Sequence, residues 1–230
     1  MEERVLPGMV EFKAGPNPGR GYLALPTHPK AAVLVLHAWW GLNDFFKGLC
    51  DRLASQGYAA LAPDLRNGAV ATTVEEAEAL MKISSADLSK STALGAVDYL
   101  HSLPKVGGRK IGAIGFSMGG GWALWLSVQR PEDVAAVVVF YSTEYPERGD
   151  YSKTRASYLG HYAPDDEWEP IEGVRALESQ LRASGREAEF HFYPGTKHWF
   201  FEENRPKEYA PDPANQAWNR TLDFLNSKLR

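Results

Sequence analysis

The chain has 230 residues, of which 44% are hydrophobic and 23% are charged, values close to the average of soluble globular proteins. Lys and Arg number 25 against 29 Asp and Glu, and the resulting net charge of -4 argues against a protein that binds nucleic acid. A single cysteine excludes an internal disulfide and a cysteine-rich zinc site. The sequence has no apolar run of roughly 18 residues, which predicts a cytoplasmic protein that does not enter membranes.

In the first half of the chain, the pattern of apolar residues predicts strands and helices in alternation. Residues 10–25 are expected to form a short antiparallel hairpin, and Ala31–Leu36 is a continuous apolar run typical of a buried strand. An amphipathic helix is expected next, because four apolar residues follow one another at helical spacing. These residues are Phe46, Leu49, Cys50 and Leu53. Residues 58–62 predict another strand, and residues 74–100 predict helical structure that is interrupted near Ser84.

The second half of the chain continues the alternation. Strands are predicted over residues 110–116, 134–141, Ser157–Tyr162 and 189–193. Helices are predicted over Met118–Gln129, over 174–181 and over the C-terminal segment with Trp218, Leu222, Leu225 and Leu229. This order implies one α/β domain over residues 1–230, with a mostly parallel sheet and helices on both of its faces. In such a sheet, functional groups collect in the loops at the carboxyl ends of strands.

The candidate nucleophile is Ser117, which lies in the sequence Gly-Phe-Ser-Met-Gly over residues 115–119. This G-x-S-x-G pattern is common by chance, but here a predicted strand runs into the serine and a predicted helix begins directly after it. A sharp strand-to-helix turn needs small flanking residues and lifts the serine hydroxyl above the sheet. The N-terminus of the helix then offers partial positive charge to a developing oxyanion.

A serine hydroxyl becomes a good nucleophile when a base takes its proton, and histidine is the usual base. His198 follows the predicted strand 189–193 in a loop near the C-terminus, where the chain order Ser, Asp or Glu, His places the base. His37 ends an earlier strand, from which it could line the site. The acid that orients the histidine is expected in the loop after Ser157–Tyr162, where spacing favours Asp166 over the neighbouring Asp165.

With these motifs in view, the sequence resembles the dienelactone hydrolase family of the α/β-hydrolase fold. The similarity extends from about Ala31 to the C-terminus and rests on five segments. They are HAWWGLNDF, GYAALAPDL, GFSMGGGWAL, GHYAPDDEWEP and YPGTKHWFFEENRP. The resemblance implies Ser117, Asp166 and His198 as a catalytic triad, and backbone N–H groups of Met118 and Trp39 as an oxyanion hole. It also implies that no large cap domain is inserted.

The sequence departs from the family pattern at three positions. Founding members carry a cysteine where Ser117 stands and a glutamate, which helps to control the cysteine thiolate, where Ala38 stands. The two changes are consistent with each other, because a serine has no thiolate charge to control. Family members that hydrolyse dienelactone hold its carboxylate with arginines, one of them four residues after the catalytic histidine. That position here is Glu202, which argues against dienelactone itself as the substrate.

We therefore expect a serine hydrolase that cleaves a small-molecule carboxylic ester or lactone through an acyl-enzyme. Neither a cofactor nor a metal ion is expected, because no nucleotide-binding or metal-ligand motif occurs in the sequence. Thioesterase, amidase or acyltransferase chemistry on the same triad remains an alternative, as does a catalytically silent ligand-binding protein. Four tryptophans in loops after strands fit either an aromatic substrate pocket or ordinary packing. They are Trp39, Trp40, Trp168 and Trp199.

Overall fold

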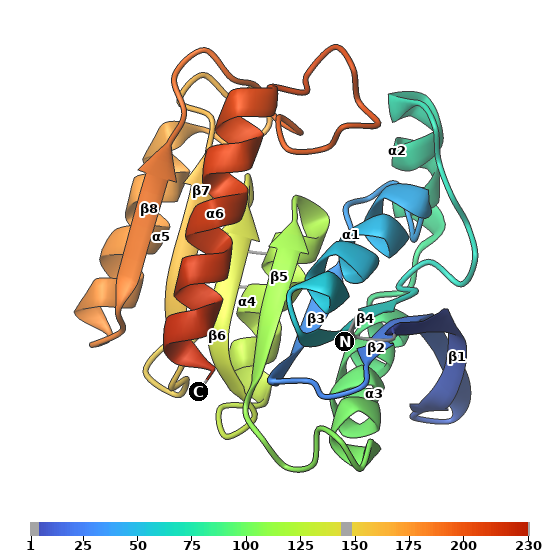
Figure 1. The fold of residues 1–230 in the computed structure, drawn as a ribbon. Coiled ribbons are helices and arrows are strands. Elements are labelled where there is room, and N and C mark those ends of the chain that lie inside the picture. The colour runs from blue at the N-terminus through green and yellow to red at the C-terminus, as the bar shows by residue number, and fades with distance from the viewer. Residues whose placement is uncertain (1–4, 144–148, 230) are drawn as a thin grey trace. The chain divides into compact units, whose positions relative to one another are not determined.

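The computed structural model describes residues 5–143 and 149–229, and the chain divides into two compact units. We call Met1–Ile111 the N-terminal unit and Gly112–Arg230 the C-terminal unit. Figure 1 shows strands and helices following one another along the chain in both units. This alternation confirms the predicted α/β class, whereas the single domain expected over residues 1–230 stays a prediction.

The strands of the N-terminal unit pair in the order β1-β2-β4-β3. Strands β1 (Val5–Ala14) and β2 (Asn17–Pro26) form the predicted antiparallel hairpin, which is longer than expected. The hairpin joins β4 (Tyr58–Pro63) in antiparallel fashion, and β4 pairs in parallel with β3 (Ala31–Leu36). Every residue of β3 and β4 is buried, as continuous apolar runs predict for strands that are covered on both faces.

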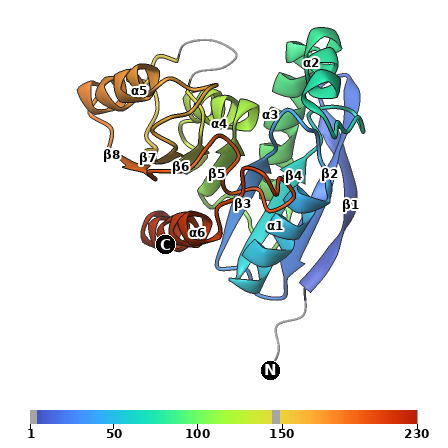
Figure 2. The ribbon, with the colours of Figure 1, turned by 90° about the horizontal axis from the view of Figure 1, so that it is seen from above.

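Three helices accompany these strands, namely α1 (Asp44–Ser55), α2 (Val74–Ile83) and α3 (Ala86–Ser102). The predicted interruption of the second helical region is confirmed. It arises because Ser84 leaves the helical conformation and the Ser85 side chain accepts a hydrogen bond from the backbone N–H of Leu88, which starts a new helix. In Figure 2, α1 and α3 cover opposite faces of the strands of this unit.

The C-terminal unit has its strands in the order β5-β6-β7-β8. Their bounds are Ile111–Phe116 for β5, Val134–Phe140 for β6, Ser157–Tyr162 for β7 and Ala188–Phe192 for β8. The pairs β6–β7 and β7–β8 are parallel. Helix α6 (Pro211–Lys228) lies on one face, and α4 (Met118–Gln129) and α5 (Ile171–Ala183) lie on the other (Figures 1 and 2).

The last helix begins at Pro211, well before the apolar residues that predicted it. The buried residues of its first two turns are Ala214 and Ala217, whose small side chains give only a weak apolar signal. The proline marks the start because it lacks only an N–H that the first turn does not use. In the described part of the chain, no helix has both the length and the apolar character that a membrane crossing requires.

Parallel pairing brings the carboxyl ends of the strands of the C-terminal unit to one edge. Phe140 of β6 is paired with His161 of β7, and Tyr162 of β7 is paired with Phe192 of β8. The ring of Phe140 also stacks on that of Phe116 at the end of β5, with centroids 4.6 Å apart. The residues that follow these four strands therefore start from neighbouring positions, where a shared site can form.

Candidate active site

Ser117 occupies a strained turn between β5 and α4. Its backbone has φ 49° and ψ -120°, a conformation that residues other than glycine rarely adopt. The turn is held by the Ser117 N–H, which donates to the carbonyl of Phe140 at 3.0 Å, and by the Gly120 N–H, which donates to the carbonyl of Ser117 at 2.7 Å. A Cβ atom at Gly115 would lie 2.1 Å from the carbonyl oxygen of Gly119, so the turn has no room for a side chain there.

The structure brings Ser117, His198 and Asp166 into one chain of hydrogen bonds. The His198 Nδ1 atom lies 2.8 Å and 3.0 Å from the two carboxylate oxygens of Asp166, so this nitrogen carries the hydrogen. The opposite ring nitrogen, Nε2, then accepts a hydrogen bond from the Ser117 hydroxyl at 2.9 Å. Only 4% of the His198 side chain and 1% of the Asp166 side chain are exposed, so both interactions are shielded from water.

The loop after β7 holds Asp166 in place. The backbone N–H groups of Trp168 and Glu169 both donate to its Oδ1 atom, at 2.8 Å and 3.1 Å. The adjacent Asp165 is exposed. The hydrogen bond to His198 thus involves the acid that spacing favoured in the sequence, although the role of Asp166 in a reaction stays a prediction.

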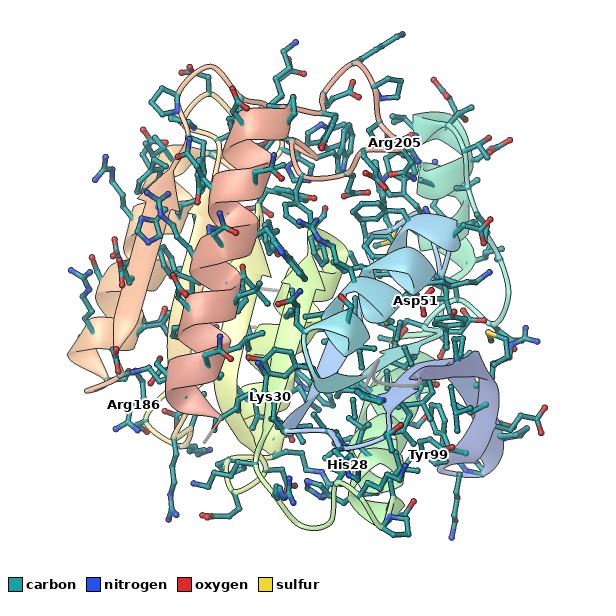
Figure 3. The ribbon with its side chains drawn as sticks, viewed as in Figure 1. His28, Lys30, Asp51, Tyr99, Arg186 and Arg205 are labelled. Carbon is teal, nitrogen blue, oxygen red and sulfur yellow. The ribbon has the colours of Figure 1, made fainter. Side chains whose placement is uncertain are left out.

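A second acid, Glu202, is completely buried behind the histidine. Its Oε1 atom accepts a hydrogen bond from the Tyr141 hydroxyl at 2.8 Å, and the Tyr141 ring packs on the His198 imidazole with centroids 4.8 Å apart. The Glu202 Oε2 atom has no hydrogen-bond partner among the described residues. Burial raises the pKa of Glu202 to about 8, an effect that the Tyr141 hydrogen bond and the charge of Arg205 partly oppose. Figure 3 shows Arg205 in the loop between β8 and α6.

The buried acid should make folding stability depend on pH. Between pH 4.5 and about 8 the folded protein keeps a proton on Glu202 that the unfolded chain has released, so its contribution to stability falls as pH rises. Glu202→Gln removes this titration and preserves an acceptor for Tyr141. We expect the free energy of unfolding of the variant, relative to that of the wild type, to rise by up to about 1.4 kcal/mol per pH unit in this window.

Urea unfolding at pH 5, 6, 7 and 8 measures this difference. Glu203→Gln is the matched control, because Glu203 is the next residue and is exposed, and it should follow the wild-type profile. Parallel profiles for the wild type and Glu202→Gln would show that Glu202 is already ionised in the folded protein at pH 5.

The two residues of the predicted oxyanion hole belong to different units. Met118 is the first residue of α4, so its backbone N–H lies at the helix N-terminus directly after Ser117. Trp39 follows β3 in the N-terminal unit, beside the buried Ala38. The oxyanion hole therefore stays a prediction.

His37, whose place after β3 made it a candidate to line the site, has both ring nitrogens bonded to the backbone. Its Nδ1–H donates to the carbonyl of Ala38 at 2.7 Å, and its Nε2 accepts from the N–H of Leu65 at 3.0 Å. Complete burial lowers the pKa of His37 to about 4, so the ring is neutral near pH 7. Cys50 is also buried, on the inner side of α1, as its helical spacing predicted.

Sequence reasoning missed two features of the C-terminal unit. Tyr141 and Glu202 meet across 61 residues of chain, and nothing in their local sequence indicates the contact. The second feature is the environment of His161. It is buried, with its two ring nitrogens bonded to Tyr193 and Thr221, and burial lowers its pKa well below the usual range.

Comparisons with known proteins agree with this architecture. A model of the dienelactone hydrolase family matches residues 20–229. "Protein usf" of Aquifex pyrophilus is 30% identical over 227 residues, which cover 96% of this chain and 98% of that protein. A Saccharolobus solfataricus protein, provisionally named a carboxymethylenebutenolidase, is 32% identical over 246 residues, with 90% and 93% of the two chains covered.

One solved structure is also similar along nearly the whole chain. It is a dienelactone hydrolase-like promiscuous phosphotriesterase, P91, from metagenomic libraries. The similarity has a TM-score of 0.87 at 23% sequence identity and covers 98% of this chain and 99% of that one. At this identity the likeness shows the fold, which is the α/β-hydrolase fold that the sequence predicted.

Proposed function

The chain belongs to the dienelactone hydrolase family and is a hydrolase of the ester or lactone class, and on this premise we propose that Ser117, His198 and Asp166 cleave the substrate through an acyl-enzyme. The hydrogen-bonded chain from the Ser117 hydroxyl through His198 to Asp166 is the observation that carries the proposal. Each of the three groups has the chemistry that its role requires.

In the first half of the reaction, the Ser117 Oγ atom attacks the substrate carbonyl carbon while His198 Nε2 takes the hydroxyl proton. The imidazolium that forms is stabilised by the Asp166 carboxylate, which accepts the Nδ1–H hydrogen bond. The tetrahedral intermediate then breaks its bond to the leaving oxygen, and His198 returns the proton to that oxygen. The products are a free alcohol, or the opened ring of a lactone, and an ester on Ser117.

Water completes the cycle. His198 removes a proton from a water molecule, which attacks the acyl carbon, and the bond to Ser117 breaks as His198 returns the proton to Oγ. In both halves the negative charge on the carbonyl oxygen needs hydrogen-bond donors, and the backbone N–H of Met118 at the start of α4 is suited to this task. The second donor implied by the family resemblance, the N–H of Trp39, stays a prediction from the sequence.

The substrate is expected to lack the carboxylate that family members acting on dienelactone hold with an arginine. Glu202 occupies the corresponding place, and its side chain is completely buried and bonded to Tyr141. A buried acid offers no positive charge to a substrate anion. This argument favours uncharged esters and lactones over dienelactone.

A panel of substrates with one shared acyl group distinguishes ester hydrolysis from related chemistry. We expect an acetate ester to be hydrolysed with the highest kcat/KM, ahead of the acetyl thioester and the acetamide. A fluorophosphonate probe should label Ser117, as peptide mass spectrometry can establish. Turnover of the thioester or amide alone would reassign the substrate class, and a protein that neither reacts with the probe nor turns over any substrate would be a silent ligand-binding protein.

A further inference from the structure

A pocket of about 80 Å³ opens beside His198 in the C-terminal unit. Two tryptophans contribute to its wall, Trp168 from the loop after β7 and Trp199 from the loop after β8. Their ring centroids are 5.7 Å apart, and the Trp168 centroid is 6.4 Å from that of His198. Trp168 is 45% exposed, which leaves aromatic surface open to a ligand next to the imidazole.

The positions of both tryptophans are linked to the proposed triad. The Trp168 N–H donates to Asp166 Oδ1 at 2.8 Å, so this backbone is tied to the acid that bonds His198. Trp199 follows His198 directly and has φ 66°, a conformation that is unfavourable for a bulky side chain and therefore depends on the surrounding fold. The backbone at both tryptophans is thus held by contacts of the fold itself.

The chemistry of the reaction indicates which part of the substrate this pocket meets. His198 must return a proton to the leaving oxygen, so that oxygen and the group attached to it lie against the imidazole when the ester bond breaks. His198 itself lines the pocket. A group bonded to the leaving oxygen can therefore extend from the imidazole onto the Trp168 ring.

Size and charge narrow the class of group that fits. The pocket is about half the volume of the 150 Å³ cavity that encloses a benzene molecule, so it covers a ring only in part and leaves one side in water. Three charged residues complete the lining, Glu167, Lys197 and Glu208. Because two are acidic and one is basic, they offer no excess of positive charge for an anionic group.

We propose that this tryptophan pocket, formed by Trp168 and Trp199 beside His198, is the leaving-group subsite and binds the uncharged aromatic alcohol portion of an ester. The proposal rests on the proposed function, because it assigns the pocket by the direction of proton transfer from His198. Stacking of the leaving group on Trp168 makes aromatic esters better substrates than alkyl esters with the same acyl group.

The test compares benzyl acetate with methyl acetate, which share an acyl group and differ in the alcohol. We expect Trp168→Ala to lower the ratio of the two kcat/KM values, benzyl over methyl, by about tenfold. Trp168→Phe keeps an aromatic ring and should recover most of that ratio. Ile83→Ala, which truncates an exposed apolar side chain of α2, is the control and should leave both values at the wild-type level. Because both esters are measured on the same variant, the ratio of their kcat/KM values does not depend on the folded fraction of that variant.

A second measurement uses the product. Benzyl alcohol should inhibit methyl acetate hydrolysis competitively in the wild type and about tenfold more weakly in Trp168→Ala. An unchanged ratio of kcat/KM in Trp168→Ala overturns the subsite and leaves the proposed function intact. A wild type that hydrolyses neither these esters nor a lactone overturns both proposals. This outcome can be told apart from failure of the subsite alone, because it is seen in the wild type before any variant is compared.

Discussion

Replacing Ser117 with alanine should lower kcat for p-nitrophenyl acetate by at least about a thousandfold. The variant lacks the Ser117 Oγ atom, which bonds to His198 Nε2 at 2.9 Å and is the atom that this nitrogen is placed to activate. No acyl-enzyme can form without it, so what remains is the weak assistance of the surrounding dipoles to attack by water. The loss should appear in kcat and in kcat/KM together, since the covalent bond forms only after the substrate is bound.

The control for this variant is Ser142→Ala. Ser142 is a nearby buried serine after β6, and its hydroxyl bonds to the Thr143 carbonyl rather than to His198. We expect this variant to retain activity within about threefold, since loss of one neutral hydrogen bond costs about 0.5–1.5 kcal/mol of folding stability and leaves the contacts of His198 in place. Steady-state kinetics and thermal melting should be recorded for both variants. If Ser117→Ala keeps full activity, another group is the nucleophile and the proposed mechanism is wrong.

Replacing Asp166 with asparagine should lower kcat by about a thousand- to ten-thousandfold, because a neutral amide no longer stabilises the imidazolium and can present its N–H₂ group to Nδ1. Histidine would then shift its hydrogen to Nε2, the nitrogen that must accept the Ser117 proton. The substitution preserves size, so the hydrogen bonds that Trp168 and Glu169 donate to Oδ1 can persist.

Asp165→Asn is the matched control, because this residue precedes Asp166 and is exposed. We expect its kcat to stay within about twofold of the wild-type value, since exposed charges interact weakly. The pH dependence of kcat in Asp166→Asn, compared with that of the wild type, reports the loss of the partner that stabilises charged His198. Loss of activity in Asp165→Asn alone would reverse the assignment of the acid.

Local signals were sufficient for most of the secondary structure and for the turn at Ser117. The strands β3 and β6 are apolar runs of six and seven residues, and Gly115 is required by its contacts with Gly119 and Gly120 in the same turn. Such features depend on neighbouring residues, so the sequence expresses them directly. The early start of α6 was missed because the buried residues of its first turns are Ala214 and Ala217, whose small side chains add little to the apolar periodicity.

The environment of His198 could be predicted only in part. The order of Ser117, Asp166 and His198 along the chain is a sequence property, and it predicted which residues to test. The hydrogen bonds that join the three side chains depend on how loops after three different strands converge. The contact of Tyr141 with the buried Glu202 has no local signature in the sequence. The sequence singled out Glu202 only as a departure from the family pattern, and its complete burial was not predicted, because glutamate is rarely fully buried.

The sequence by itself thus determined the α/β class and the strand-turn-helix around Ser117, which follow from short-range patterns, and its resemblance to a family indicated the hydrolase class. The tertiary structure decided which acid faces His198, which acid is buried, and which tryptophan is left exposed beside the imidazole. These outcomes depend on burial and on hydrogen bonds between residues distant in the chain. Their free energies arise only when the strands of the C-terminal unit pair and bring those residues together.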